Sequence, residues 1–236
     1  MGLASRIRAL LGKGPSVPTG AIRDARFVVM DTELTGLEPR KDAIISIGAL
    51  RMRGIEIDVG GSFQVLVRPN VELGNESVLI HGITHSQVAD QPPLEEALTA
   101  FQDYLKDEPI LVGYCLALDL AFLDRGFRKC FNRPFRPPAV DTLSLYAWLK
   151  RRHEHPAFSL PPGALTLFGL SKAFGVPVER GHNALADAYM TAQLFQRLLG
   201  LAAPLGLDSL QDLLRIGNPD STGDQMIGPQ QGAYYG

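Results

Sequence analysis

The chain contains 236 residues, and its formal charge of −2 comes from 25 acidic and 23 basic side chains. Hydrophobic residues make up 45% and charged residues 20% of the sequence, which is typical of a globular protein and excludes a wholly disordered, collagen-like or coiled-coil chain. No stretch approaches the roughly 20 apolar residues of a membrane span, and Arg6 and Arg8 interrupt the apolar residues of the first segment, as a secretory signal would not allow. We therefore expect a cytoplasmic protein with no membrane partner, in which Cys115 and Cys130 are reduced thiols.

Three stretches of the chain differ in composition. Residues 1–22 indicate a short basic arm that ends in glycines and prolines, and residues 23–200 contain the apolar patterns of one globular domain. Residues 201–236 predict a C-terminal extension, in which a short helix at 209–216 precedes a segment that we expect to be mobile. The charge of −2 does not exclude a nucleic-acid partner, because carboxylates that gather around divalent cations make a protein acidic only until the metal binds.

The first half of the domain predicts strands. Residues 26–30 and 43–50 are short apolar segments, and residues 62–68 alternate apolar and polar side chains. Gly60 and Gly61 predict a turn between the second and third segments. Three consecutive strands with short connections predict an antiparallel meander.

The second half alternates helices with short apolar strands. Residues 94–105 have apolar side chains on one helical face, and residues 110–114 and 139–141 predict buried strands. Further helices are predicted over residues 118–131, 143–149, 165–174 and 184–199. Because helical crossovers join parallel strands, this order predicts an α/β fold with a mixed five-stranded sheet flanked by helices.

Two acidic side chains follow the first apolar segment. Asp31 and Glu33 are two residues apart, and side chains with that spacing point to the same face of a strand. Neighbouring carboxylates repel each other unless one is protonated or a hard cation such as Mg²⁺ or Mn²⁺ binds between them. The alternative for this pair alone is that Asp31 opens a turn and Glu33 is solvated.

A third acid lies near the strand predicted at 110–114. Asp119 is in the first turn of the following helix, and the carboxyl ends of strands line the functional crevice of open α/β sheets. The alternative for Asp119 is a structural role, in which the carboxylate stabilises the helix N-terminus through the helix dipole.

His182 and Asp187 begin the helix predicted at 184–199. They are five residues apart, which is about 140° around a helix, so they do not face one ion from a common side. Asp187 can be a metal ligand while His182, on the loop side, contacts a water molecule from another direction. A surface histidine and an exposed helical aspartate are the alternative for this motif alone.

The three motifs together resemble, in order and context, those of the DEDDh 3′→5′ exonucleases, the family of the bacterial polymerase III proofreading subunit, RNase T and oligoribonuclease. The resemblance covers about residues 25–199 and implies an RNase H-like fold. Four supporting segments also resemble the family: Thr35-Gly36-Leu37, His81-Gly82-Ile83-Thr84, Val140-Asp141-Thr142-Leu143 and the segment from Leu170 to Val176.

The resemblance implies metal-dependent hydrolysis of single-stranded nucleic acid from the 3′ end, with DNA favoured over RNA. Two divalent cations, Mg²⁺ or Mn²⁺, are expected at Asp31, Glu33, Asp119 and Asp187. Glu33 and His182 are the expected catalytic residues, with His182 as the general base. The expected products are nucleoside 5′-monophosphates.

The resemblance also implies a site for the terminal nucleotide. The residues expected to contact the substrate are Thr32, Leu34, Thr35, Gly36, Leu37, His81, Tyr114 and Cys115. The chain departs from the family here, because members often have His-Asn at the positions of Tyr114 and Cys115. A missing asparagine removes a polar contact near the site, which puts the level of activity and the choice of substrate in doubt.

Two other functions fit the sequence. One is an exoribonuclease of the same fold, and the other is a non-catalytic module that binds nucleic acid or a polymerase. For the leading function the expected partners are a single-stranded 3′ end and a DNA polymerase or clamp, in proofreading or repair. We expect no zinc site at His81 with His85 or at His153 with His155, because neither pair has a third ligand nearby.

Overall fold

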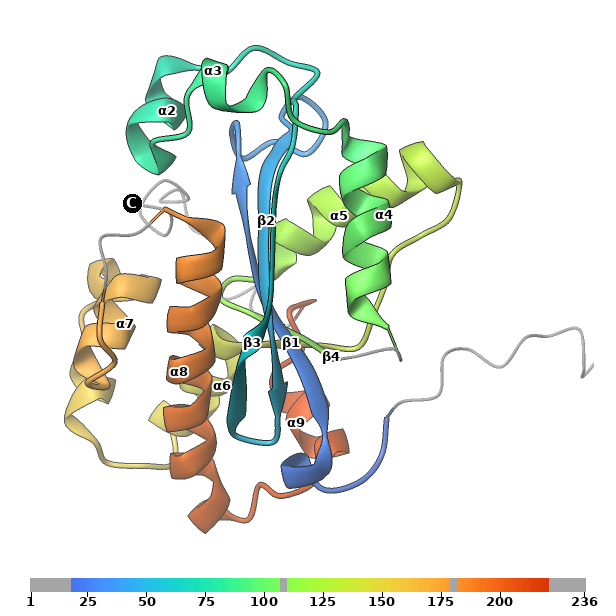
Figure 1. Ribbon diagram of the computed structural model, residues 1–236. Coiled ribbons are helices and arrows are strands. Elements are labelled where there is room, and N and C mark those ends of the chain that lie inside the picture. Colours follow the sequence, from blue (N-terminus) through green and yellow to red (C-terminus); the bar gives the residue numbers. More distant parts are fainter. Residues whose placement is uncertain (1–17, 107–109, 179–181, 221–236) are drawn as a thin grey trace, which may run out of the picture.

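A mixed sheet of five strands forms the centre of the computed structural model, which describes residues 18–106, 110–178 and 182–220 (Figure 1). The strand order is β3-β2-β1-β4-β5. The strands are β1 (Arg26–Leu34), β2 (Ile44–Arg53), β3 (Glu56–Leu66), β4 (Ile110–Gly113) and β5 (Ala139–Asp141). This sheet confirms the predicted fold class.

The first three strands form the predicted antiparallel meander, whereas β4 lies parallel to β1 and β5 parallel to β4. The predicted turn at Gly60 and Gly61 is wrong, because both glycines lie within β3. The pairing of β2 with β3 shifts register between Ala49 and Arg51, so the glycines accompany an irregularity in the strand rather than its end. The chain reverses instead at Gly54, whose φ of 56° is in the left-handed region that glycine adopts readily.

β1 continues past its predicted end at residue 30, so both acids of the first motif lie inside the strand. The last part of β1 pairs with β2, with Asp31 opposite Gly48 and Glu33 opposite Ser46. The alternative in which Asp31 opens a turn is therefore excluded. The alternation of the strand fixes the direction of both acidic side chains.

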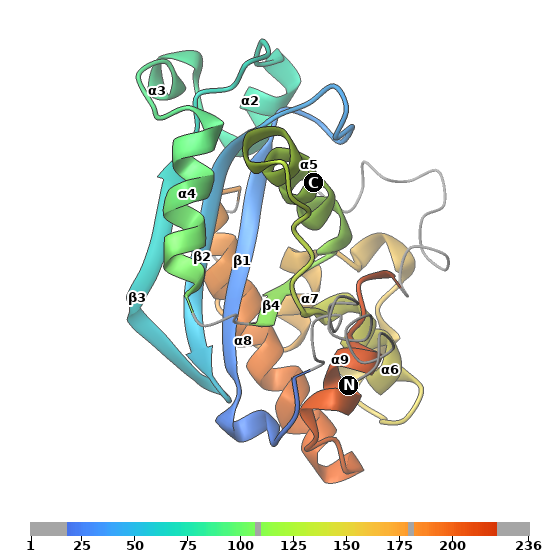
Figure 2. The ribbon, with the colours of Figure 1, turned by 90° about the vertical axis from the view of Figure 1, so that its right-hand side faces the viewer.

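Helices cover both faces of the sheet (Figure 2). The main helices are α4 (Leu94–Leu105), α5 (Ala117–Phe131), α6 (Thr142–Lys150), α7 (Leu167–Ala173) and α8 (Ala184–Ala202). α4 and α5 pack over Val28 and Met30 on one face, and α6, α7 and α8 pack over Phe27 and Val29 on the other. The helices predicted for these parts of the chain are thereby confirmed.

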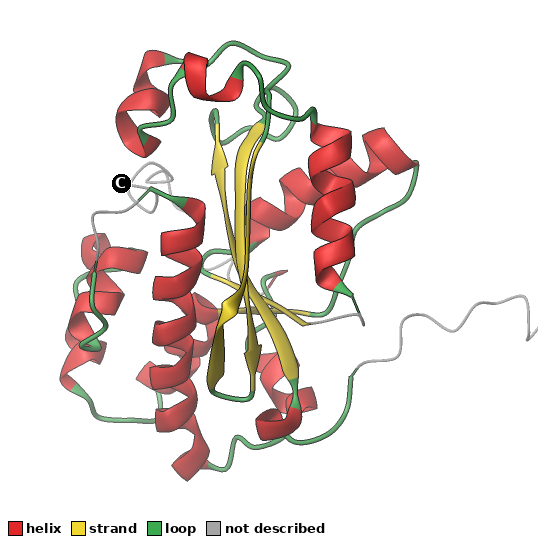
Figure 3. Ribbon diagram, viewed as in Figure 1, coloured by secondary structure: helices red, strands yellow, loops and turns green. Residues whose placement is uncertain are grey.

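Two short helices that the sequence did not predict lie beyond the end of β1 at which the acids are found (Figures 1 and 3). They are α2 (Asn75–His81) and α3 (His85–Val88). Gly82 ends α2 with a φ of 69°, and a capping box at Thr84 begins α3. Leu79 in α2 is 86% exposed, so the apolar residues of this segment do not all lie on the buried face of the helix. The sequence therefore lacks the apolar spacing that predicts a helix here.

The boundary expected at residue 200 falls inside α8, and the chain from 201 to 220 packs on the domain. α9 (Leu210–Ile216) buries Leu213 in the core on the α8 side of the sheet. The backbone N–H of Asp141 then donates to the carbonyl of Gly217 at 2.7 Å. A single short helix has too few turns to display an apolar period, so this packing could not be predicted from the sequence.

Residues 1–17 of the expected arm and residues 221–236 of the expected extension lie outside the described ranges. Of the helices in residues 18–106, 110–178 and 182–220, none is both long enough and apolar enough to cross a membrane.

Candidate active site

Three carboxylates from β1 and α8 meet on one face of the sheet. Asp31 and Glu33 point toward the face that α8 covers, and Asp187 lies in the first turn of α8. One oxygen from each of these side chains lies within 4.8 Å of the others. In the part of the chain that the structure describes, no other group of three His, Cys, Asp or Glu side chains is gathered in this way. Two motifs separated by most of the domain are thus brought together.

The start of α8 fixes the position of the Asp187 carboxylate. The side chain of Asn183 caps the helix by accepting hydrogen bonds from the backbone N–H groups of Leu185 at 3.1 Å and Ala186 at 3.2 Å. His182 has a left-handed φ of 67°, and its backbone N–H donates to Asp187 Oδ2 at 3.1 Å. The five-residue spacing therefore lets a loop residue hold the helical carboxylate while its imidazole stays partly exposed.

Asp119 approaches from the beginning of α5, next to Thr32 of β1. Its side chain is buried, and Oδ1 accepts hydrogen bonds from the backbone N–H of Thr32, at 3.1 Å, and from the Thr32 hydroxyl. It lies outside the group of three carboxylates, but its charge raises the pKa of both Asp31 and Glu33. An aspartate that only stabilised the helix N-terminus through the helix dipole would not need to be buried. The structure therefore favours a role for Asp119 in the acidic cluster.

Glu33, Asp119 and Asp187 are buried and Asp31 is half-buried, and none of the ion pairs among the described residues involves these four acids. Burial, followed by the charges of Asp187 and Asp119, raises the pKa of Glu33 to about 8. Burial raises the pKa of Asp119 to about 7, although hydrogen bonds from Thr32 lower it. Burial and the other three acids raise the pKa of Asp31 well above its ordinary value. A hard divalent cation would relieve this repulsion, and an all-carboxylate donor set fits Mg²⁺ or Mn²⁺.

Residues 34–37 lead from β1 into a turn at the same end of the sheet. Leu34 packs on the α4 and α5 core, and the Thr35 hydroxyl donates to Asp42 Oδ1 at 3.2 Å. A Cβ at Gly36 would meet the Asp42 carboxylate, and Leu37 is partly buried like the three residues before it. The hydrogen bonds of Thr35 with Asp42 and Ala43 hold this turn from within.

Thr32, Tyr114 and Cys115, which were expected to contact the substrate, have partners within the protein. Both donors of Thr32 bind Asp119, and the buried Tyr114 donates its hydroxyl to the carbonyl of Leu165 at 2.6 Å. Cys115 has a left-handed φ of 51°, and its backbone N–H donates to Asp141 Oδ1 at 3.0 Å. Asparagine adopts the left-handed backbone conformation more readily than cysteine. Cysteine in place of the family's asparagine at position 115 therefore makes this conformation less favourable, in addition to removing a polar side chain.

A pocket of about 520 Å³ opens beside the acidic cluster. His81 and His182 line it together with Ser46, which lies opposite Glu33 in the pairing of β1 with β2. Nδ1 of His81 accepts a hydrogen bond from the backbone N–H of Ile83 at 3.0 Å. His81 Nε2 and Ser46 Oγ are buried and have no hydrogen-bond partner within the described residues. Ser46 was not among the residues predicted to contact the substrate, because its place opposite Glu33 depends on the register of β1 with β2.

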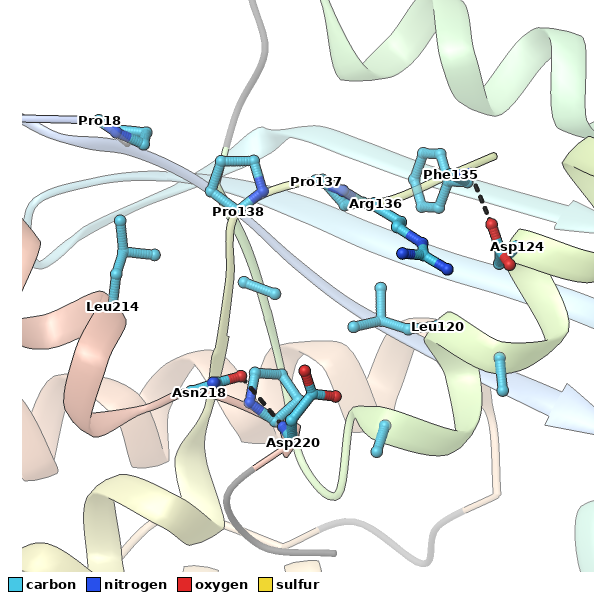
Figure 4. A pocket seen from close by; sticks show the side chains of 14 residues that line it. Pro18, Leu120, Asp124, Phe135, Arg136, Pro137, Pro138, Leu214, Asn218 and Asp220 are labelled. Carbon is cyan, nitrogen blue, oxygen red and sulfur yellow. Dashed lines mark hydrogen bonds between the residues drawn. The ribbon is translucent and has the colours of Figure 1, made fainter. Parts of the chain in front are cut away.

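Another pocket, of about 620 Å³, has none of the four acids in its lining (Figure 4). It is bounded by α5, by α9 and by the segment at 135–139, and Leu120, Arg136 and Asp220 are among its lining residues. No residue that the motifs singled out lines this pocket. It is therefore not the candidate active site.

The second pair of histidines lies in an aromatic cluster. His155 stacks on Phe174 with ring centroids 5.3 Å apart, and its Nδ1 accepts a hydrogen bond from the backbone N–H of Ala157 at 3.2 Å. His153 lies edge-on to His155 at 6.5 Å. The group of three potential ligands found among the described residues lies at the acidic cluster and includes neither histidine.

The residues of the candidate site lie in the part of the chain that is similar to known proteins. The chain matches the model of the family described as Exonuclease (RNase_T) over residues 28–195. It is 31% identical over 193 residues to the DNA polymerase III PolC-type of Thermotoga maritima, an alignment that covers 82% of this chain and 13% of that relative. The chain thus spans a small part of the length of this curated relative.

Solved structures share the fold. E. coli Exonuclease I in complex with a dT13 oligonucleotide matches with a TM-score of 0.66 and 20% identity, over 77% of this chain and 42% of that chain. Exonuclease X in complex with 5′ overhanging duplex DNA matches with a TM-score of 0.58 and 22% identity, over 81% of this chain and 99% of that chain. These similarities confirm the RNase H-like fold. Because the family match covers residues 28–195, which include all four acids and His182, the chain belongs to the exonuclease family.

Proposed function

We propose that this chain is a metal-dependent 3′→5′ exonuclease that releases nucleoside 5′-monophosphates from the 3′ end of single-stranded nucleic acid. The observation that carries the proposal is the meeting of Asp31, Glu33 and Asp187, whose ligand oxygens lie within 4.8 Å of one another in an exonuclease-family domain. A non-catalytic binding module would have no use for buried acids whose mutual repulsion destabilises the fold.

We assign two divalent cations, Mg²⁺ or Mn²⁺, to the acidic cluster. Asp31, Glu33 and Asp187 would hold the first ion, because their oxygens already converge. Asp31, whose pKa responds to all three other acids, would be shared with the second ion, and Asp119 would bind that ion directly or through water. Bound there, the cations would supply Lewis-acid stabilisation of the scissile phosphate and of the leaving 3′ oxygen.

His182 would act as the general base and accept the proton of the attacking water. Its backbone hydrogen bond to Asp187 keeps the residue at the edge of the acidic cluster. Its partial exposure allows the imidazole to reach a water molecule and afterwards to release the proton to solvent. Glu33 would belong to the same catalytic group, since it would share a cation with Asp187.

The terminal nucleotide would lie between the turn at 35–37 and the pocket of His81 and His182. Leu37 offers an apolar surface to the last base, and such contacts tolerate every base. Because Nδ1 of His81 accepts a backbone hydrogen bond, the neutral ring has its proton on Nε2, which would donate to the substrate. A preference for DNA over RNA is supported by the similarity to a DNA polymerase and to an exonuclease solved with an oligonucleotide.

We also propose that the chain works with a DNA polymerase or its clamp, in proofreading or repair, in the cytoplasm. The support for a polymerase is the 31% identity to a PolC-type polymerase, of which the aligned region is 13%. A purified polymerase of that type, tested for co-elution with this chain, would examine the partnership separately from the activity.

Digestion of labelled oligomers tests the proposed function. Single-stranded DNA and RNA of equal sequence, each with a 5′ label, are incubated with Mg²⁺, with Mn²⁺ or with EDTA, beside an Asp31→Ala control. We expect a descending ladder that requires metal, forms faster on DNA and is absent in the variant. Faster digestion of RNA would make the protein an exoribonuclease, and intact oligomers under every metal condition would overturn the enzymatic function.

A further inference from the structure

Gly48 of β2 lies where the start of α8 approaches the sheet most closely. A Cβ atom at this position would lie 2.2 Å from the backbone carbon of Ala184, 2.2 Å from the backbone nitrogen of Leu185 and 2.5 Å from the Ala184 carbonyl oxygen. Cβ atoms in real proteins do not approach other heavy atoms that closely. The glycine is therefore required for space, because its φ is not in the left-handed region.

The atoms that a side chain would meet cannot rotate away. They belong to the helix backbone, so any residue other than glycine would push the first turn of α8 from β2 by about 1 Å. The surroundings are closely packed, since Ala184 is fully buried. The first turn of α8 would move, because its residues Ala184 and Leu185 are the ones that contact Gly48.

The same turn contains the helical acid of the site. Gly48 lies opposite Asp31 in the pairing of β1 with β2, and Asp187 follows Ala184 within one helical turn. On its other side Gly48 pairs with Gln64 of β3, whose side-chain amide donates to Asn183 Oδ1, the cap of α8, at 3.4 Å. The distance between the acids of β1 and the acid of α8 thus depends on how closely α8 packs against Gly48.

We propose that Gly48 is a positioning residue that sets the spacing between the Asp31–Glu33 pair and Asp187, and with it the affinity of the site for divalent cations. Gln64 assists by holding the cap of α8 from the neighbouring strand. This inference rests on the proposed metal site. A displacement of about 1 Å in a site of this kind lowers activity by about 100-fold without removing any ligand.

Mn²⁺ binding by the full chain, measured by isothermal titration calorimetry in the absence of nucleic acid, tests the proposal. We expect Gly48→Ala to weaken Mn²⁺ binding by about 10- to 100-fold while far-UV circular dichroism shows that the fold is kept. The matched control is Gly200→Ala at the far end of the same helix, where a Cβ would meet no atom within 4 Å. Wild-type affinity is expected for this control.

A rescue separates positioning from general destabilisation. Asp187→Glu lengthens the acid by one methylene, so it should weaken Mn²⁺ binding in the wild-type background and restore part of it in Gly48→Ala. A purely structural effect of Gly48→Ala would give additive losses in the double variant. Additive losses would therefore overturn the proposal.

Gln64→Ala keeps the proposal testable if Gly48→Ala does not fold. It removes an exposed hydrogen bond and adds no clash, and it should weaken Mn²⁺ binding by about 2- to 5-fold with no change in Tm. Wild-type Mn²⁺ affinity in Gly48→Ala, or in Gln64→Ala where Gly48→Ala is unfolded, would contradict the role. An unmodified chain that binds no Mn²⁺ would instead overturn the proposed function itself.

Discussion

Thr32 donates hydrogen bonds from both its backbone N–H and its hydroxyl to Oδ1 of Asp119, a residue 87 positions away along the chain. The two side chains are buried, and the contact joins β1 to the start of α5. Thr32 lies between Asp31 and Glu33, so the strand that presents two acids on one face also fixes a third acid from the other. Thr32 is thus a positioning residue for Asp119.

Replacement of Thr32 by valine tests this role. The substitution keeps the shape but leaves Asp119 with the backbone donor alone, so we expect activity or metal affinity to fall by about 10- to 100-fold, as for other partners of metal ligands. Steady-state digestion of a DNA oligomer across a range of Mg²⁺ concentrations would measure the loss.

Thr99→Val is the matched control, because the Thr99 hydroxyl donates only to the carbonyl of Glu95 on the surface of α4. Thr32→Ser, which restores a hydroxyl, should recover most of the activity. Equal activity in Thr32→Val and Thr99→Val would show that Asp119 does not need this hydrogen bond.

His182→Gln should lower kcat by about 10²- to 10⁴-fold, because the variant loses the general base and keeps the backbone N–H that holds Asp187. Metal binding should be unchanged for the same reason. Single-turnover rates at saturating Mg²⁺, together with Mn²⁺ titration calorimetry, separate the two effects. His85→Gln at the start of α3 is the control; a His182→Gln enzyme with the rate of this control would remove His182 from the mechanism.

Without metal, the stability of the protein should decrease as the pH rises. The folded-state pKa of Glu33 is about 8 against an ordinary value of 4.5, and that of Asp119 is about 7 against 3.8. The folded state therefore keeps protons that the unfolded chain has already released, and the free energy of unfolding falls between about pH 4 and about pH 8.

Thermal unfolding in EDTA across this pH range, repeated with Mn²⁺, checks the expectation. Mn²⁺ should raise Tm most at the highest pH, where the carboxylates are ionised and ready to bind it. An Asp31→Asn variant should show a shallower dependence on pH. A Tm in EDTA that increases steadily with pH would mean that the acids do not repel one another in the folded protein.

The left-handed backbone at Cys115 predicts opposite effects for two substitutions. Cys115→Val places a β-branched residue at φ 51°, which should cost about 1–2 kcal/mol and lower Tm by roughly 2–8 °C. Cys115→Asn should keep the stability of the original chain or exceed it, because asparagine tolerates this conformation. Differential scanning calorimetry of both variants would decide, and equal Tm values would mean that the backbone relaxes at this position.

The parts of the site that follow from local periodicity could be predicted from the sequence. The two-residue spacing of Asp31 and Glu33 gave their common face, and the start of a helix after His182 gave the place of Asp187. The mixed sheet followed from the order of strand and helix patterns, and the match to the exonuclease family model confirmed the family.

Other features depend on contacts between distant segments and left no local pattern. The hydrogen bonds of Thr32 to Asp119 and the packing of Gly48 on α8 arise only when the sheet is assembled. The glycines at 60 and 61 resemble a turn in the sequence, but pairing with β2 keeps them inside a strand. Residues 201–220 have too short an apolar pattern to reveal that they pack on the domain.

The proposed function requires Asp31, Glu33 and Asp187 to bind a catalytic divalent cation. Crystals grown with Mn²⁺ and a nucleoside 5′-monophosphate, measured for anomalous scattering of manganese, test it most directly. We predict a manganese peak within coordination distance of all three carboxylates, about 2.0–2.4 Å, and a second peak shared by Asp31 next to the phosphate of the nucleotide. A map with no manganese between β1 and the start of α8 would show that these carboxylates do not form the metal site.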